Sequence, residues 1–222
     1  MLYSKDDLVS IYNFNKRTFD IFSSFILLLI FSPIILIVSL AIKIDSKGPV
    51  FADTPERVGK GGKLFYLFKF RTMIINAYNL LKTDPKFKKA YEEQQSGGNY
   101  KIRNDPRITK VGKFIRKHSL DEIPQLINVL RGEMSLVGPR PYYPEELEKQ
   151  QIKYPETKKF VKEVLSVKPG ITGFWQVSGR SELNFDKRIK MDASYAKNKS
   201  LLYDIYITLK TPWAMIAGKG AL

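Results

Sequence analysis

The sequence predicts an α+β fold that is mostly helical, with one apolar helix that meets a membrane. Three observations lead to this prediction. The 22 residues from 21 to 42 carry no charge, several later segments place apolar residues at helical spacing, and only short runs alternate as strands do. We divide the chain into an N-terminal arm at 1–15, a membrane helix at 16–45 and a domain at 46–222.

The uncharged run is long enough to cross a bilayer core, because at about 1.5 Å per residue it spans about 33 Å. Lys16 and Arg17 precede it and Lys47 follows it, so both flanks carry the charge preferred on the cytoplasmic side. Ser32 and Pro33 interrupt its middle, and a proline there kinks a helix. A kinked single span and a re-entrant helix bent at Ser32 and Pro33 both fit. Re-entry would leave Lys16 and Lys47 accessible from the cytoplasm.

Turn signals divide the domain at 46–222. Glycines at 59–62 predict a hairpin loop that leads into an extended segment at 63–73. We expect one further short strand within 168–180. Apolar residues at helical spacing predict helices at 74–81, 85–95, 108–115, 122–130, 144–153, 184–198 and 200–217. The last of these, which carries Trp213, fits both an interfacial amphipathic helix and an ordinary core helix.

The composition excludes several kinds of chemistry. Lys and Arg total 37 against 22 Asp and Glu, a net charge of +15, which indicates anionic partners such as lipid headgroups, nucleotides or nucleic acid. The chain has no cysteine, and His118 is its one histidine. Disulfides, thiolate catalysis and a zinc site built on several histidines are therefore excluded. Carboxylate chemistry, oxygen-bound divalent ions and recognition of phosphate by Lys and Arg remain.

Three cations stand out from the basic background. Lys69 and Arg71 lie within an otherwise aromatic run, where a charge needs a partner or a ligand, and a diphosphate would supply the counter-charge. Arg140 lies between two prolines, which restrict the backbone on both sides. A guanidinium on such a stiff mount suits bidentate recognition of phosphate. A rigid turn with a solvent-facing arginine is the alternative.

One acid pair lies in this basic surrounding. Glu122 follows Ser119 at the spacing of a capping box, but Pro124 would then remove the first hydrogen bond of the helix. A helix that starts at Asp121 avoids this conflict. Both carboxylates would then lie at the positive end of the helix dipole, which favours ionised forms suited to a nucleophile or a metal ligand. A capping role and a catalytic dyad both remain open.

The ordered motifs of this chain closely resemble the bacterial sugar transferases, which are monotopic phosphoglycosyl transferases. The similar stretches begin at Lys16 and Arg17 and include KFRTM at 69–73, SLDEIPQ at 119–125, NVLRGEMSLVGPRP at 128–141 and KPGITGFWQVSGR at 168–180. The resemblance implies a re-entrant helix bent at Ser32 and Pro33, with 46–222 as a cytosolic, membrane-associated catalytic domain on the cytoplasmic face of the bacterial plasma membrane. It also implies that the chain is the catalytic unit without the additional transmembrane region of many relatives.

The same resemblance implies that sugar-1-phosphate passes from a UDP-sugar to polyprenyl phosphate, expected to be undecaprenyl phosphate, with release of UMP. This would be the first membrane step of exopolysaccharide, capsule or glycoconjugate synthesis. Asp121 would be the nucleophile that forms an aspartyl-phosphosugar, Glu122 would assist it, and both would hold Mg²⁺. His118 would have no catalytic role. The residues expected to bind substrate are Lys69, Arg71, Arg140, Arg180, Arg188 and Asp192.

Two other classes of protein fit parts of the sequence. The net charge and the interleaved aromatic and basic residues also suit a membrane-tethered nucleic-acid-binding protein. The basic clusters also suit a scaffold that binds acidic membrane lipids. Neither class explains the acid pair or the arginine between prolines, so we expect no nucleic-acid partner. The sequence leaves the identity of the sugar and homo-oligomerisation open.

Overall fold

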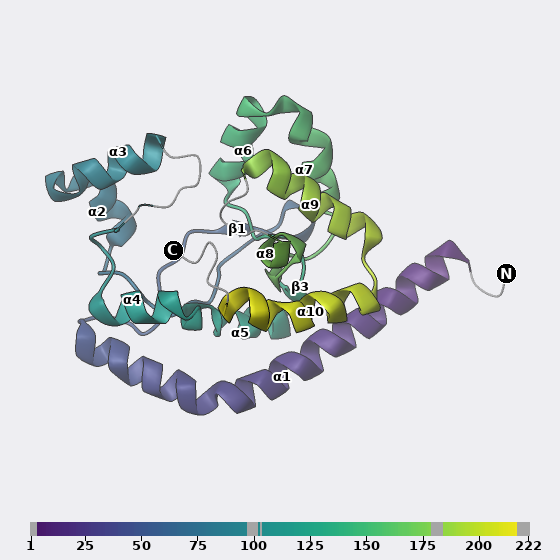
Figure 1. Ribbon diagram of the computed structural model, residues 1–222, viewed down its shortest axis with the longest axis horizontal. Coiled ribbons are helices and arrows are strands. Elements are labelled where there is room, and N and C mark those ends of the chain that lie inside the picture. The colour runs from purple at the N-terminus through teal and green to yellow at the C-terminus, as the bar shows by residue number, and fades with distance from the viewer. Residues whose placement is uncertain (1–3, 97–101, 103, 179–183, 217–222) are drawn as a thin grey trace.

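The computed structural model describes residues 4–96, 102, 104–178 and 184–216. One long helix, α1 (Lys5–Asp45), underlies the molecule, and the rest of the described chain packs on its concave side (Figure 1). The helix continues through Pro33 and is visibly bent. Prolines are a common cause of such bends, because they remove a backbone donor. Ser32 Oγ donates to the carbonyl of Leu29 at 2.8 Å, within the same stretch of helix.

The strands form two small sheets. β1 (Arg57–Val58) pairs antiparallel with β2 (Leu64–Phe65) around the turn η1 (Lys60–Gly62), which confirms the hairpin predicted at 59–62. β3 (Ser135–Val137) pairs parallel with β4 (Gly170–Thr172). A Cβ on Gly170 would lie 2.1 Å from the nitrogen of Gly138. The chain can therefore make this close approach only with glycine at position 170.

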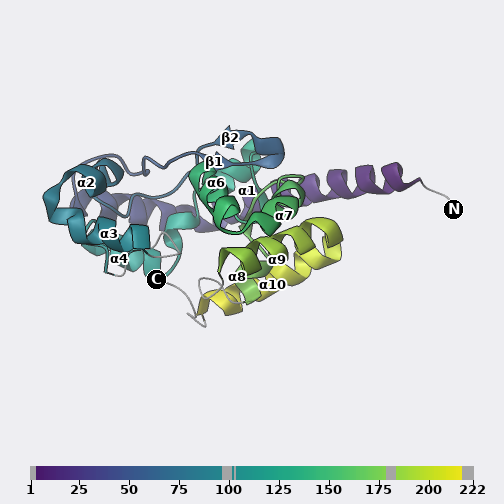
Figure 2. The same cartoon turned by 90° about the horizontal axis from the view of Figure 1, so that it is seen from above.

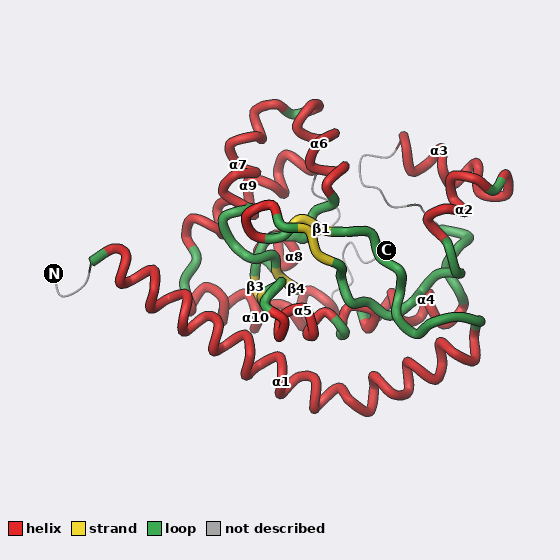
Figure 3. The backbone as a smooth tube through the Cα atoms, turned by 180° about the vertical axis from the view of Figure 1, so that it is seen from behind, coloured by secondary structure: helices red, strands yellow, loops and turns green. Residues whose placement is uncertain are grey.

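The other described elements are helical, so the α+β, mostly helical fold class is confirmed, although the helices at 158–164 and 174–178 were not predicted. Among the described elements, α2 and α3 form a lobe apart from that of α6, α7 and α9 (Figures 1, 2 and 3). Their bounds are α2 (Ala77–Thr83), η2 (Pro85–Phe87), α3 (Lys88–Ser96), α4 (Lys110–Lys117), η3 (Leu120–Glu122), α5 (Gln125–Arg131), α6 (Pro144–Lys153), η4 (Pro155–Thr157), α7 (Lys158–Val164), α8 (Phe174–Ser178), α9 (Phe185–Asn198) and α10 (Leu201–Ile216).

Helix α1 begins well before the predicted start at residue 16. Ser4 Oγ accepts a hydrogen bond from the nitrogen of Asp7 at 3.1 Å, and the Asp7 carboxylate accepts one from the nitrogen of Ser4 at 2.9 Å. This reciprocal pair is a capping box, which fixes the start of a helix. Most of the arm at 1–15 is therefore helical.

Both ends of the apolar run in α1 are fixed to the same body. At the first end, Arg17 donates to the carbonyls of Val129 and Leu130, at 2.6 and 2.8 Å, where α5 ends. At the other end, Asp45 Oδ2 accepts from the nitrogen of Val111 in α4 at 3.3 Å. A small apolar cluster closes this second end and contains Val38, Ile42, Phe70 and Ile115.

The outer face of α1 is apolar and uncovered. The stretch Val9–Asp45 is long and apolar enough to cross a membrane, with a mean hydropathy of 3.0 and 11% of that window buried. Helix α10 buries Ile207 on one face and exposes Leu209 and Trp213 on the other, so it combines both predicted characters. The large apolar side chains of α1 between 21 and 42 that are more than half exposed are Phe22, Phe25, Ile26, Leu29, Ile30, Leu36, Ile37 and Leu40.

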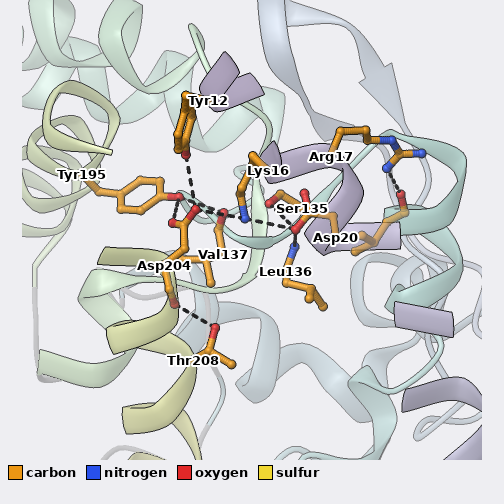
Figure 4. Close-up of polar contacts among 11 residues, drawn as sticks. Tyr12, Lys16, Arg17, Asp20, Ser135, Leu136, Val137, Tyr195, Asp204 and Thr208 are labelled. Atoms are coloured by element: carbon orange, nitrogen blue, oxygen red, sulfur yellow. Dashed lines mark hydrogen bonds and ion pairs between the residues drawn. The ribbon is translucent and has the colours of Figure 1, made fainter. Parts of the chain in front are cut away.

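A buried polar cluster joins the N-terminal half of α1 to β3, α9 and α10 (Figure 4). Lys16 Nζ lies 3.0 Å from Asp20 Oδ1 and 3.3 Å from Asp204 Oδ2, and the hydroxyl of Tyr195 donates to Asp204 Oδ1. We call Lys16, Asp20, Tyr195 and Asp204 the anchor cluster. Lys16 is 9% exposed, so the expectation that it is accessible is wrong, because two carboxylates enclose its ammonium group. Lys47 is exposed.

Candidate active site

Lys69 holds the two acids of the predicted dyad. Its Nζ lies 3.1 Å from Asp121 Oδ2 and 3.1 Å from Glu122 Oε1. The side chain of Asp121 is 12% exposed and that of Glu122 is 43% exposed. Asp121 is therefore the enclosed carboxylate, while Glu122 faces solvent. The fold has brought together groups that are more than 50 residues apart in the sequence.

Backbone hydrogen bonds hold Lys69 against the acids. The nitrogen of Phe70 donates to the carbonyl of Asp121 at 3.1 Å. Asn128, which is fully buried in α5, accepts from the nitrogen of Phe68 and donates to the carbonyl of Tyr66, both at 2.8 Å. An amide that bonds both neighbours in this way fixes the register of the segment. Helix α5 and the turn before it thus position the lysine.

The backbone at the acid pair differs from both predicted arrangements. Asp121 and Glu122 lie in the 3₁₀ turn η3, and α5 begins only at Gln125, with Pro124 as its N-cap. Ser119 has a φ of 54° and makes no capping bond, so the capping box is wrong, and so is a helix that starts at Asp121. A left-handed residue other than glycine costs about 1–3 kcal/mol, and such strain is typical of functional sites.

Two arginines act electrostatically on this group: the charge of Glu122 favours the protonated form of Arg140, and the charge of Arg57 acts against protonation of Lys69. Arg140 follows β3, donates its backbone nitrogen to Asp192 at 3.2 Å and places its guanidinium 5.5 Å from the ring centre of Trp175. Arg57 at the start of β1 lies 3.2 Å above the ring of Tyr143. The sequence predicted Arg140, whereas Arg57 showed only as part of a basic run. Nothing local in the sequence indicated that Arg57 would face the site.

The charges of the site fix the protonation of its lysine. Burial lowers the pKa of Lys69, but the nearby carboxylates of Asp121 and Glu122 raise it by more, so the net shift is upward. Burial also lowers the pKa of Arg140, and the charge of Glu146, with smaller effects that include Glu122, reverses this. Lys69 is therefore a constant positive charge at the acids.

Two of the predicted C-terminal residues, Asp192 and Arg188, bond to the segment that carries Arg140 or to the helix after it. Asp192 is 1% exposed, and its Oδ2 accepts from the Tyr142 hydroxyl at 2.8 Å as well as from the Arg140 nitrogen. Burial raises the pKa of Asp192 to about 7. Arg188 pairs with buried Glu146 at 2.6 Å. Asp192 thus positions the turn that carries Arg140, and Arg188 positions α6 through Glu146. Arg180 lies outside the described residues.

Arg71 does not face the acid pair. Its Nε donates to the carbonyl of Pro49 at 2.6 Å, and its two other nitrogens donate to the side chain and carbonyl of Ser46 at 2.7 and 2.9 Å. The residue is 5% exposed. Because all three guanidinium nitrogens bond to the protein, Arg71 secures the chain just after α1. This structural role replaces the phosphate-binding role that we expected.

The acid pair has carboxylate donors of the kind that Mg²⁺ takes, but on its own it has only two of them. Within the residues that the structure describes, no group of three or more His, Asp or Glu side chains could hold a metal ion. Mg²⁺ is commonly held by one or two carboxylates together with substrate phosphates. Asp121 and Glu122 supply the carboxylates, and Glu122 is open to solvent.

The chain belongs to the bacterial sugar transferase family, whose family model matches residues 11–218. It is 45% identical over 210 residues to an uncharacterized sugar transferase of Haemophilus influenzae. It is 44% identical over 214 residues to the undecaprenyl-phosphate galactose phosphotransferase of Salmonella typhimurium. It is 40% identical over 207 residues to the exopolysaccharide production protein ExoY of Rhizobium meliloti.

These alignments cover 93%, 94% and 93% of this chain. They cover 42% of the Haemophilus and Salmonella proteins and 87% of ExoY. The chain thus spans about two fifths of the length of the first two relatives and most of the third.

Proposed function

We propose that the protein transfers sugar-1-phosphate from a UDP-sugar to polyprenyl phosphate, with undecaprenyl phosphate as the acceptor, and releases UMP. The observation that carries this proposal is the enclosed carboxylate of Asp121, which is paired with Lys69. The charges of Arg57 and Arg140 act on the same group of residues. A carboxylate can attack phosphorus directly and split one difficult transfer into two steps. The cations around it suit the phosphate groups of both substrates.

In the first step, a carboxylate oxygen of Asp121 attacks the β-phosphorus of the UDP-sugar. A new O–P bond forms, the bond from this phosphorus to the bridging oxygen breaks, and its electron pair leaves with UMP. In the second step, a phosphate oxygen of the polyprenyl carrier attacks the same phosphorus. The aspartyl O–P bond then breaks and the carboxylate of Asp121 is restored. The bond between sugar and phosphate stays intact throughout.

The side chains around Asp121 would offset the negative charge of the carboxylate and the substrate phosphates. Lys69 stays protonated, so it lowers the repulsion between the attacking carboxylate and the diphosphate. Glu122 shares this lysine and remains open to solvent. Mg²⁺ held by Asp121 and Glu122 would neutralise further phosphate charge. Arg140 offers fixed donors for phosphate oxygens.

We also propose that α1 enters the membrane and returns to the face it came from, with the site on the cytoplasmic side. A spanning helix would separate its two ends by about 30 Å of hydrocarbon. Instead, Arg17 at one end and Asp45 at the other both bond to the body that carries the acid pair. The apolar outer face of α1 suits contact with lipid. This arrangement would place the site where a lipid-borne phosphate meets a soluble nucleotide.

The topology can be tested with single cysteines, because the chain has none of its own. Asn13 and Lys47 are both exposed and lie outside the apolar run. We expect Asn13→Cys and Lys47→Cys to be protected from an impermeant thiol reagent in intact cells and labelled in inverted membrane vesicles. Labelling of the two positions from opposite sides would overturn re-entry.

The reaction is tested with purified protein in nanodiscs, Mg²⁺, undecaprenyl phosphate and a panel of UDP-sugars, with UMP release as the readout. We expect at least one sugar to give UMP, and a labelled phosphosugar to remain on the protein when the acceptor is omitted. Asp121→Asn should abolish both, whereas Asp53→Asn, which changes an exposed acid, should not. If no sugar gives UMP, or if Asp121→Asn remains fully active, the proposal is wrong.

A further inference from the structure

We propose that Arg57, Arg140 and Tyr143 form a binding site for the phosphate of the departing nucleoside monophosphate. We call these three residues the leaving-phosphate site. The inference rests on the proposed function and deepens it, because it separates the groups that act on the attacked phosphorus from those that act on the leaving one. Arg57 and Tyr143 had no role in the sequence prediction.

Arg57 is a buried cation that forms no ion pair with any residue that the structure describes. It is 8% exposed, and its guanidinium is stacked 3.2 Å above the ring of Tyr143. One terminal nitrogen donates to the carbonyl of Pro141 at 3.1 Å, while Nε has no hydrogen-bond partner in the part of the chain that the structure describes. A buried charge is costly unless it is paired. An anionic ligand would supply the missing partner.

Arg140 shares one feature with Arg57, and its charge acts on that residue. Its Nε is also buried without a hydrogen-bond partner among the described residues. Burial lowers the pKa of Arg57, and the positive charge of Arg140 lowers it further. Glu146, an acid of α6 that acts on both arginines, pairs with Arg188 through Oε1 at 2.6 Å, and its Oε2 has no partner among the described residues. Each of the two guanidinium groups thus keeps one nitrogen, Nε, without a partner in the described part of the chain.

Tyr143 lies where the cations of the site converge. Burial raises its pKa, but Arg57, the bond from Tyr78, Arg140 and Lys69 together lower it, so the net shift is downward. Its hydroxyl lies 3.4 Å from that of Tyr78 in α2. The tyrosine pair thus connects the α2 and α3 lobe to the start of α6. Both hydroxyls can donate to a phosphate oxygen.

In the proposed reaction, these cations would stabilise the charge that develops on the leaving group. When the bond to the bridging oxygen breaks, that oxygen gains negative charge and leaves on the nucleoside monophosphate. Cations aimed at this oxygen are stronger partners in the transition state than in the bound substrate, which is the condition for catalysis. Lys69 is engaged by Asp121 and Glu122, on the attacking side. Arg57 and Arg140 each keep a guanidinium Nε without a partner among the described residues, and their planar guanidinium groups suit the leaving side.

The inference is tested by binding alone, in the Asp121→Asn background, where no turnover interferes. Calorimetry would measure the affinity of the full chain for UMP, inorganic phosphate and uridine. We expect Arg57→Gln to weaken the binding of UMP by about tenfold or more, the effect of losing a charge-assisted hydrogen bond. Tyr143→Phe, which keeps the ring under Arg57, should weaken it by about twofold to threefold. Uridine binding should not change with either variant.

Arg131 provides a matched control. It also places its guanidinium over an aromatic ring, 4.5 Å from that of Phe68, but unlike Arg57 it is exposed. Arg131→Gln should bind UMP as the parent does. If Arg57→Gln does not fold, Arg57→Lys replaces it, because lysine keeps the charge but loses the planar fork. We then expect about tenfold weaker binding.

The outcomes separate this inference from the proposed function. If turnover occurs and Arg57→Gln or Arg57→Lys binds UMP with the parent affinity, the leaving-phosphate site is wrong and the reaction stands. If no UDP-sugar is turned over but UMP and phosphate binding depend on Arg57, the anion site stands and the proposed reaction is wrong. An equal loss of affinity in Arg131→Gln would show that only net charge matters, which would also overturn the site.

Discussion

The anchor cluster and the candidate active site are both buried groups of charges, but they differ in how completely they are paired. In the anchor cluster, Lys16 lies between two carboxylates, and Tyr195 completes the bonding of Asp204. In the active site, Arg57 and Arg140 each keep a buried nitrogen without a partner among the described residues. Buried polar groups are normally satisfied. The complete cluster therefore holds the fold, whereas the incomplete one contains the unpartnered donors on which the proposed leaving-phosphate site rests.

The largest expected effect comes from exchanging one acid in each cluster. Asp121→Asn should lower the rate of UMP release by about 10³-fold or more, as losing a nucleophile usually does. Asp204→Asn should leave that rate in the folded protein within about twofold, because Asp204 bonds to Lys16 and Tyr195 and not to the acid pair, and the one amide oxygen of asparagine can still accept from Tyr195. The measurement is the rate at saturating substrates. A comparable loss in both variants would show that the two clusters are coupled.

Exchanging one lysine in each cluster should affect stability most in the anchor cluster and activity most in the active site. Lys16→Met leaves two buried carboxylates unpaired and should lower the free energy of unfolding by about 3–5 kcal/mol. Lys69→Met removes a more exposed lysine, so it should cost less stability while it abolishes UMP release. Denaturant unfolding in detergent measures the first effect and the UMP assay the second. The comparison fails if Lys69→Met is the more destabilising variant.

Two arginines sharpen the same distinction. Arg71→Gln removes donors to the carbonyl groups after α1 and should lower the free energy of unfolding by about 1–3 kcal/mol. Its affinity for UMP should equal that of the parent, in contrast to Arg57→Gln. Calorimetric titration of the folded variants decides the matter. Weaker UMP binding by Arg71→Gln would restore the phosphate-binding role that the sequence predicted for it.

The last prediction concerns pH. Because the pKa of Asp192 is raised to about 7 in the fold, the native state binds its proton more tightly than the unfolded chain does. Its contribution to stability is therefore fully present below the ordinary pKa of 3.8 and is lost as pH rises from there to about 7, with a slope of at most about 1.4 kcal/mol per pH unit. Asp192→Asn should remove this slope. Equal pH profiles of unfolding for both proteins would contradict the assignment.

Local patterns predicted most of the elements and the chemically important residues. The helix at 144–153, the hairpin at 59–62 and the acid pair all follow from spacing and turn residues. The start of α5 at Gln125 could not be predicted, because the left-handed backbone of Ser119 depends on the packing around it. Arg57 was missed for a similar reason, since its partner Tyr143 lies far along the chain.

The sequence by itself determined the apolar run with Pro33, the order of the elements and the presence of Asp121 and Glu122 in a basic chain, because these depend on periodicity and composition. Only the tertiary structure decided which cations meet the acids. Lys69 and Arg71 are two residues apart in one aromatic run, yet Lys69 faces Asp121 and Arg71 faces Ser46. That choice depends on hydrogen bonds to residues distant in the sequence, such as Asn128, and no local pattern records them.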